Sequence, residues 1–259
     1  MRRSWLLVLA VGCGRLQFDA RDDAMAGSNG DAPRADAVGD GVAATTCGTF
    51  GSRACDGFEQ GAIDPMWTLD TSAGSITRDT TRAFRGSASV HVHIDQITVT
   101  TTNPRATLFG PAGLNATVTG MIYFRVWMYV ASPLATNLFN QMINAANMSG
   151  QGMSLGTRNG VFANNNYTDV NYSESATPFP LDRWMCLQYE MPSNTTGTAR
   201  MFVDGAELTD AALVKTTPQP PPTHVYLGLE WVGNPSSMPA ADAWLDEIIV
   251  DTNPTTCAQ

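Results

Sequence analysis

The sequence has few charged residues, and lysine is nearly absent. Its 259 residues include 15 Lys and Arg against 24 Asp and Glu, which gives a formal net charge of −9, and Lys215 is the only lysine. A chain of this charge repels the phosphates of nucleic acids, and no cluster of basic residues offsets the repulsion, so we expect no nucleic-acid partner. The low charged fraction of 15%, with many Ser, Thr, Asn and Gly, favours an all-β protein outside the cytoplasm.

Hydrophobic runs long enough to cross a bilayer as a helix are also missing. The run at residues 5–11 is short and follows two arginines, as in a signal peptide. Residues 9–13, Leu-Ala-Val-Gly-Cys, resemble the lipobox of bacterial lipoproteins, in which the cysteine is acylated. We predict that residues 1–13 are a lipoprotein signal peptide ending at Cys13. The alternative is an ordinary secretory signal cleaved near residue 20 or 24.

The lipobox resemblance implies where the protein resides. Several acyl chains on Cys13 would anchor it stably, so the membrane is an expected partner through the lipid anchor only. Gly14 follows the cysteine, and a non-acidic residue there implies the outer membrane of the bacterial cell envelope. Residues 14–46 are mostly small or polar and cannot bury enough apolar surface to offset their ordering entropy. We predict a disordered acidic tether there, followed by one domain at residues 47–259.

The remaining four cysteines fit an oxidising compartment. Cys47, Cys55, Cys186 and Cys257 allow three disulfide pairings, of which we favour Cys47 with Cys55 and Cys186 with Cys257. Zinc is the competing interpretation, but no two of these cysteines have the C-x-x-C spacing that zinc sites commonly use.

Strand patterns fill the predicted domain, and no segment sustains the period of an amphipathic helix over several turns. In residues 121–130 one face carries Ile122, Phe124, Val126, Met128 and Val130. Further strands are expected at residues 89–94, 152–155, 161–163, 184–191, 199–203, 224–232 and 244–250. Residues 142–148 are expected to form a short helix or a loop, and the Asn-rich run at 163–171 a hairpin loop. The spacing predicts a two-sheet antiparallel jelly-roll β-sandwich.

The order of several short motifs resembles the concanavalin A-like lectin/glucanase superfamily, including its laminin G-like members. The motifs are Gly57-Phe58-Glu59, Arg85-Gly86-Ser87, Phe124-Arg125-Val126-Trp127, Phe202-Val203-Asp204-Gly205 and Trp244-Leu245-Asp246-Glu247. A galactose-binding-like jelly roll is the second fold choice. Either resemblance implies a structural calcium ion (Ca²⁺), for which Glu59 and Asp246 would be the side-chain ligands.

The strand at 121–130 also predicts a ligand platform. Alternation places Tyr123, Arg125, Trp127 and Tyr129 on the face opposite the aliphatic stripe. In the resembled superfamily such strands line a concave sheet, where aromatic rings stack on sugars and arginine binds hydroxyls or carboxylates. The alternative is a second buried layer, in which loops cover these rings.

Two further polar groups could join that platform. His91 and His93 share a strand face with Asp95, and Glu230 shares one with His224 and Tyr226. We include His93 and Glu230 among the expected ligand-binding residues. An H-x-H pair can also bind a metal, but the sequence shows no third ligand, and solvent-exposed histidines are the simpler interpretation.

The catalytic patterns of the resembled superfamily are missing from the sequence. Laminarinase-like enzymes use E-x-D-x-x-E, and alginate lyase-like enzymes commonly use R-x-E-x-R, and neither occurs. We therefore expect a membrane-anchored carbohydrate-binding or adhesion-type module without catalysis of its own, with a polysaccharide or glycan as partner. A polysaccharide lyase or glycoside hydrolase is the alternative, and a structural envelope lipoprotein is the third interpretation.

Overall fold

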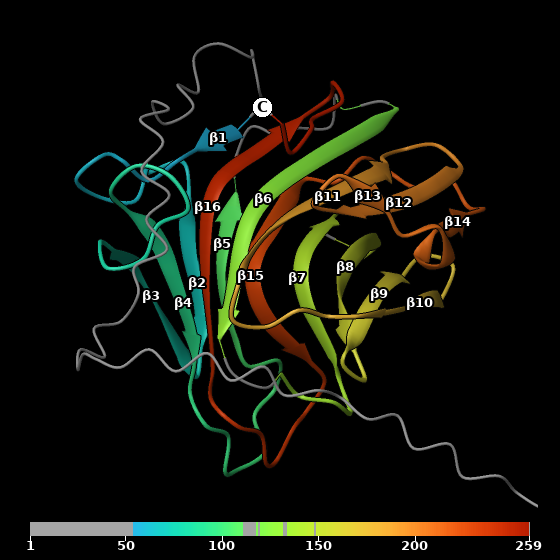
Figure 1. Cartoon of the computed structure of the whole chain (residues 1–259). Coiled ribbons are helices and arrows are strands. Elements are labelled where there is room, and N and C mark those ends of the chain that lie inside the picture. The colour runs from blue at the N-terminus through green and yellow to red at the C-terminus, as the bar shows by residue number, and fades with distance from the viewer. Residues whose placement is uncertain (1–53, 111–117, 119, 132–133, 148, 259) are drawn as a thin grey trace, which may run out of the picture. The chain divides into compact units, whose positions relative to one another are not determined.

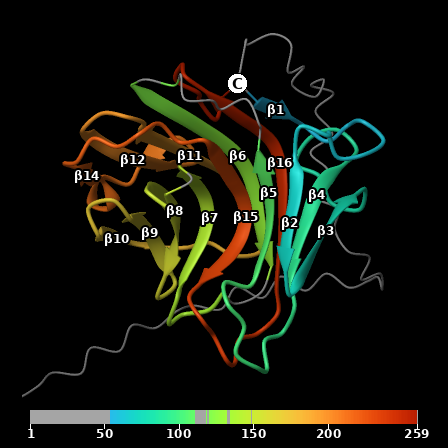
Figure 2. The same cartoon turned by 180° about the vertical axis from the view of Figure 1, so that it is seen from behind.

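The computed structural model describes residues 54–258 apart from 111–117, 119, 132–133 and 148. Cys13, Cys47, the predicted signal peptide and the predicted tether lie outside these residues. The described residues belong to one unit of the chain, and they form two antiparallel β-sheets packed face to face (Figures 1 and 2). This is the predicted jelly-roll β-sandwich. Among the described residues, no helix has the length and hydrophobicity needed to cross a membrane.

The first sheet contains nine strands. They are β1 (Ala54–Asp56), β3 (Gly74–Asp79), β4 (Ser89–Ile94), β6 (Met121–Ala131), β11 (Trp184–Pro192), β12 (Gly197–Val203), β13 (Ala206–Glu207), β14 (Leu213–Lys215) and β16 (Ala241–Asp251). Their order is β13-β12-β11-β6-β16-β4-β3, with β1 also paired to β16 and β14 to β12. The longest strands, β6 and β16, therefore lie side by side in the middle.

The second sheet contains seven strands. They are β2 (Thr68–Ser72), β5 (Arg105–Gly110), β7 (Phe139–Ala146), β8 (Gly152–Arg158), β9 (Val161–Asn166), β10 (Asn171–Pro178) and β15 (His224–Val232). Their order is β10-β9-β8-β7-β15-β5-β2. A short 3-10 helix, η2 (Thr209–Ala211), lies between β13 and β14 in the chain.

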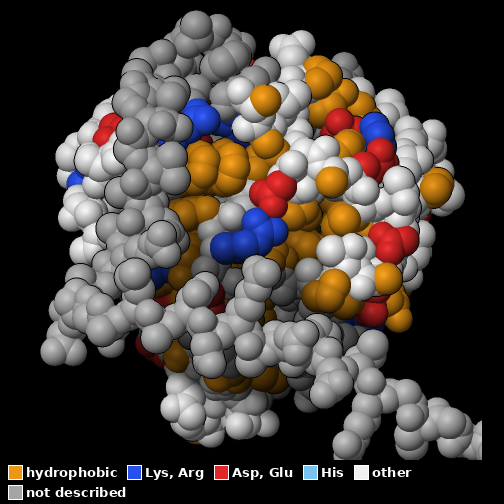
Figure 3. All heavy atoms as spheres, viewed as in Figure 1, with side chains coloured by type: hydrophobic (Ala, Val, Ile, Leu, Met, Phe, Trp, Pro, Cys, Tyr) orange, Lys and Arg blue, Asp and Glu red, His pale blue; other side chains and the backbone are white. Residues whose placement is uncertain are grey.

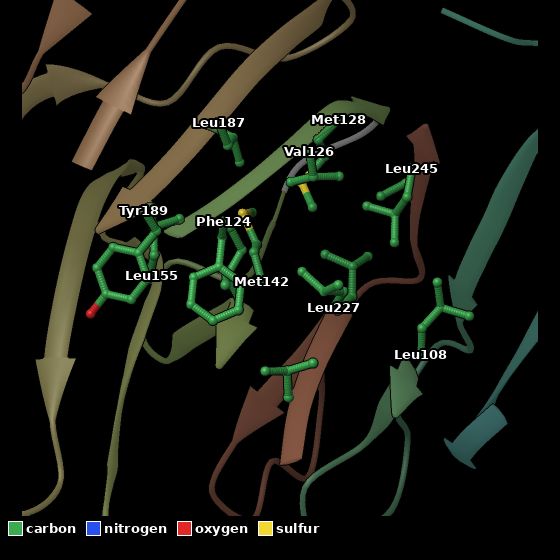
Figure 4. Packing of buried hydrophobic residues seen from close by; sticks show 14 of the residues in the cluster. Leu108, Phe124, Val126, Met128, Met142, Leu155, Leu187, Tyr189, Leu227 and Leu245 are labelled. Carbon is green, nitrogen blue, oxygen red and sulfur yellow. The ribbon is translucent and has the colours of Figure 1, made fainter. Parts of the chain in front are cut away.

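The core lies between the two sheets and follows the predicted alternation. The aliphatic stripe of β6 is buried, with Phe124 at 1% exposure and Val126 and Met128 at 0%. Figure 4 shows these side chains pointing toward Met142 and Leu227 of the second sheet. Each such side chain contributes roughly 1.5–3 kcal/mol when it leaves water. Burial of the alternate side chains fixes the strand register, because a slip by one residue would turn the stripe to solvent.

Two segments differ from the sequence prediction. The expected short helix or loop at 142–148 is mostly strand, since β7 runs to Ala146 between β15 and β8. The Asn-rich run does not form one exposed loop, because Asn164 and Asn166 lie in β9 with 0% exposure. Asn164 accepts a hydrogen bond from the buried hydroxyl of Tyr189 at 2.8 Å, so an amide that looks suited to a turn is satisfied within the fold.

Candidate binding groove on the second sheet

A hollow of about 290 Å³ lies on the face of the second sheet that points away from the core. Neighbouring strands supply its lining, because Tyr226 of β15 lies directly opposite Asn144 of β7, and Glu230 lies opposite Arg105 of β5. The turn after β9 adds Tyr167. His224, Tyr226 and Glu230 of β15 line the hollow, while Leu227 and Leu229 are buried in the core, as period-two geometry requires.

Gly228 allows β15 and β5 to pair closely between two residues that line the hollow. It lies between Tyr226 and Glu230 on the same strand face, at a bulge in the pairing with β7. Its φ is +149°, and a Cβ atom there would lie 2.3 Å from the carbonyl oxygen of Ala106. Any larger residue would therefore force β15 and β5 apart.

Charges in the hollow largely balance. The Nε of Arg105 donates to Asp70 at 2.8 Å, and this hydrogen bond raises the pKa of the guanidinium. Glu230 accepts a 2.6 Å hydrogen bond from the side-chain amide of Gln141. Burial raises the pKa of Glu230, although the nearby Arg105 opposes this effect. The site therefore holds one fixed ion pair and one carboxyl group that takes up a proton more readily than usual.

The aromatic groups of the hollow are held in place by their neighbours. The Tyr167 hydroxyl donates to Ser154 at 2.6 Å and contacts Gln141, and burial raises its pKa. Burial lowers the pKa of His224, which favours the neutral imidazole. Its ring lies edge-on to that of Tyr226, with the ring centroids 5.0 Å apart. The arrangement offers flat rings, amides and a protonatable carboxyl group to one ligand.

No family model and no curated protein matches this chain. Among solved structures, the cellulose-induced protein Cip1 matches with a TM-score of 0.61 at 19% identity, over 79% of this chain and 99% of Cip1. An endo-β-1,4-glucuronan lyase from the fungus Trichoderma reesei matches with a TM-score of 0.56 at 12% identity, over 78% of this chain and 96% of the lyase. They share its fold. That fold is the two-sheet jelly-roll sandwich predicted for this domain.

Of the ligand-binding residues expected from the sequence, Glu230 lies in this hollow and His93 does not. His93 is on β4 of the first sheet, so the two do not meet. The shared face of Glu230, His224 and Tyr226 was visible in the sequence of one strand. Arg105 and Tyr167 were missed, because they come from separate strands and turns whose alignment depends on pairing across the sheet.

The predicted platform on β6 is on the expected face, and other parts of the chain cover much of it. Arg125 is 1% exposed and lies 3.4 Å from the carboxylate of Glu247. The ring of Phe84 stacks on Trp127 with the centroids 3.5 Å apart. The guanidinium of Arg82 lies 3.8 Å from the ring centroid of Tyr129. The covered-layer alternative therefore describes the middle of this strand, because the loop after β3 lies over it.

The aromatic side chains of this face are less covered than Arg125. Tyr123, Trp127 and Tyr129 are half-buried, whereas Arg125 is buried. A second hollow of about 560 Å³ lies between Trp127, Gln188 and the C-terminal segment that includes Thr255. Its walls are formed partly by this terminal segment, which Gln188 holds by donating to the Thr255 carbonyl at 2.6 Å. An edge of Trp127 is thus the part of the predicted platform that borders a hollow.

Glu59 and Asp246, the expected calcium ligands, hold the two ends of one loop. Glu59 accepts hydrogen bonds from the backbone of Ser87 at 2.9 Å and of Ala88 at 3.2 Å. Asp246 accepts from the backbone of Phe84 at 2.8 Å and of Arg85 at 3.0 Å. The carboxylate oxygens of both residues thus already accept hydrogen bonds from backbone N–H groups. Calcium would need these oxygens, together with several others, as its ligands. In this arrangement the residues do not fit a calcium ion, and calcium stays a prediction.

The disulfide prediction is confirmed where the structure describes it. Cys186 and Cys257 are bonded, with their Cα atoms 5.8 Å apart, and join β11 to the C-terminal segment. Cys55 is also disulfide-bonded. Its predicted partner, Cys47, lies outside the described residues.

Figure 3 shows acidic and basic side chains next to one another on one face of the surface. The described ion pairs include Arg200 with both Glu190 and Glu207, at 3.1 Å and 2.5 Å. Pairing of this kind leaves a surface of mixed charge, which gives little long-range attraction for a polyanion.

Proposed function

We propose that the protein binds a carbohydrate chain in the groove of the second sheet. The observation that carries this proposal is the convergence of Tyr226, His224, Asn144 and Glu230 on one hollow. Aromatic rings present apolar surface to the C–H faces of a sugar ring. Amides and carboxyl groups both donate to and accept from sugar hydroxyls, so a few of them fix the orientation of the ligand.

The charge of the groove favours neutral sugars over densely anionic ones. Arg105 is already paired with Asp70, and Glu230 adds acid rather than base. The glucuronan lyase of similar fold acts on a polysaccharide, which supports a glycan as the ligand class without specifying the sugar.

A polysaccharide-active enzyme is the second candidate, and one observation favours it. Glu230 is a half-buried carboxyl group with a raised pKa, and it shares the hollow with a histidine whose pKa is lowered. Such a pair suits proton transfer to and from a bound sugar. Under this alternative Glu230 would be a general acid and His224 a base, whereas under the first proposal both only position the ligand.

Two further statements from the sequence belong to the same proposal. We infer that Cys13 carries lipid and anchors the domain to the bacterial envelope, with the outer membrane implied by Gly14. An adhesion-type role would follow from a glycan-binding domain held at that surface. Mass spectrometry of the membrane fraction tests the anchor, because an acylated Cys13 adds the mass of its lipid and a Cys13→Ser variant stays soluble.

A glycan array with the full chain tests binding, and incubation with alginate, laminarin and pectin tests turnover. We expect saturable binding that Tyr226→Ala weakens by about tenfold or more, since loss of one stacking ring removes on the order of 1–3 kcal/mol. Tyr172→Ala is the matched control, because Tyr172 is 58% exposed on β10 outside the groove. Product formation that Glu230→Gln abolishes would establish the enzyme instead. Binding that is equal in both tyrosine variants contradicts the groove as the site.

A further inference from the structure

The outer face of the first sheet carries a cluster of side chains that the groove does not involve. His91 and His93 lie two residues apart on β4, so both point to the same face. Asp242 of β16 lies directly opposite His93 in the strand pairing. The structure thereby supplies the third group that the H-x-H pattern alone did not reveal.

The three side chains converge on one point. The Nε2 of His91 lies 2.8 Å from Oδ1 of Asp242, and the Nδ1 of His93 lies 2.7 Å from the same oxygen. All three candidate ligand atoms lie within 4.8 Å of one another. We propose that these three residues form a binding site for a divalent transition-metal ion, with Zn²⁺ as the best match.

The chemistry of the three atoms suits zinc. Two imidazole nitrogens and one carboxylate oxygen are a donor set that zinc takes, at metal–ligand distances of about 2.0–2.2 Å. Tetrahedral geometry at those distances separates ligand atoms by roughly 3.3 Å. The two nitrogens therefore need to withdraw from the Asp242 oxygen by about half an ångström, which small side-chain rotations provide. The fourth position is left to water or to a ligand from outside.

Neighbouring groups orient the two imidazoles. The Nε2 of His93 lies 3.3 Å from Oδ1 of Asp95, which leaves Nδ1 for the metal. A second carboxylate on the far nitrogen of a metal-binding histidine is the usual way to fix its ring. The ring of His91 stacks on Trp244 with the centroids 4.4 Å apart. The indole Nε1 of Trp244 in turn donates a hydrogen bond to the carboxylate of Asp79 at 2.6 Å.

The local charge also favours a cation. Asp242 and Asp95 contact the histidines directly, and Asp79 lies close enough to interact electrostatically with His91. The guanidinium of Arg82 opposes this effect, because it is positively charged and its Cζ atom lies 4.3 Å from the centroid of the neighbouring Trp244 ring. The three side chains of the site are 25–30% exposed, so a metal ion can reach them from solvent.

Zinc titration of the full chain, after treatment with a chelator, tests the site. We expect one Zn²⁺ per chain by calorimetry, a rise in melting temperature that chelator reverses, and a visible absorption spectrum when Co²⁺ replaces Zn²⁺. His93→Gln and Asp242→Asn should each weaken zinc binding at least tenfold, and Asp95→Asn by a smaller factor.

The chain contains its own matched control, because it has only three histidines. His224→Gln removes the third, on the opposite sheet, and should leave zinc affinity unchanged. Melting curves without metal identify any variant that fails to fold; if His91→Gln does so through loss of the Trp244 stack, Asp242→Asn still gives the test. Absence of saturable zinc binding, or equal affinity in the His91→Gln/His93→Gln double variant, overturns the proposal.

Discussion

The guanidinium of Arg125 lies 3.4 Å from the carboxylate of Glu247, and neither side chain reaches solvent. A buried charge that loses its partner is costly, because water cannot replace the lost contact. Arg125→Ala is therefore expected to lower the free energy of unfolding by about 3–5 kcal/mol, measured by urea denaturation with the disulfides intact. The control is Arg158→Ala, which removes an exposed pair with Glu174 and should change stability by about 0–1 kcal/mol. If both substitutions lower the free energy of unfolding by the same amount, burial of the Arg125–Glu247 pair does not determine its contribution.

Trp127→Ala separates the two interpretations of the β6 face. Because Phe84 covers the Trp127 ring, the substitution should destabilise the domain by roughly 2–4 kcal/mol and leave glycan affinity unchanged. Thermal melting and glycan binding of the same preparation measure both. If Trp127→Ala loses glycan binding but keeps its melting temperature, the face of β6 is the ligand platform.

The raised pKa of Glu230 predicts a pH dependence of stability. Its pKa is raised above the ordinary value of 4.5, so the native state holds the proton more tightly than the unfolded chain does. Its contribution to stability is present below pH 4.5 and is lost as pH rises through the higher native pKa. Glu230→Gln removes this loss, so its stability relative to the natural protein should increase as the pH rises from 4.5 through the native pKa of Glu230. A difference in stability that is constant with pH contradicts a raised pKa at Glu230.

The bond between Cys186 and Cys257 closes a loop with a sequence separation of 71 residues. Cross-links of this length commonly stabilise by about 2–5 kcal/mol, chiefly by restricting the unfolded chain. Replacing both cysteines with alanine should lower the melting temperature accordingly, with peptide mapping under non-reducing conditions as the check on pairing. An unchanged melting temperature would show that the C-terminal segment is held by its hydrogen bonds alone.

Calcium binding is tested by measuring the melting temperature with and without added Ca²⁺. If Ca²⁺ binds at Glu59 and Asp246, its addition raises the melting temperature, and Glu59→Gln removes the effect. A titration without any shift eliminates this site and leaves the two carboxylates as anchors of the loop at residues 84–88.

The sequence predicted the sandwich because strand patterns follow one another between turn residues, and β4 and β6 alternate between buried and less buried positions. β7 escaped prediction because it is buried along most of its length, and a strand of that kind carries no alternation. The groove was only partly predictable. Glu230, His224 and Tyr226 share one strand face, whereas Arg105 reaches them through strand pairing over a long sequence separation. In the same way, Asp242 meets His91 and His93 only through the pairing of β16 with β4. The covering of Trp127 was equally hidden, since it depends on the path of the loop that carries Phe84.

The loop at residues 82–88 and the C-terminal segment both lie against the first sheet, where they contact Tyr129, Trp127 and Gln188. Substitutions on that side must preserve contacts with the chain itself. In the groove of the second sheet, neither that loop nor the C-terminal segment is among the lining residues. Exchanges at Tyr226 or Glu230 are therefore expected to change ligand preference without disturbing the loop contacts of the first sheet.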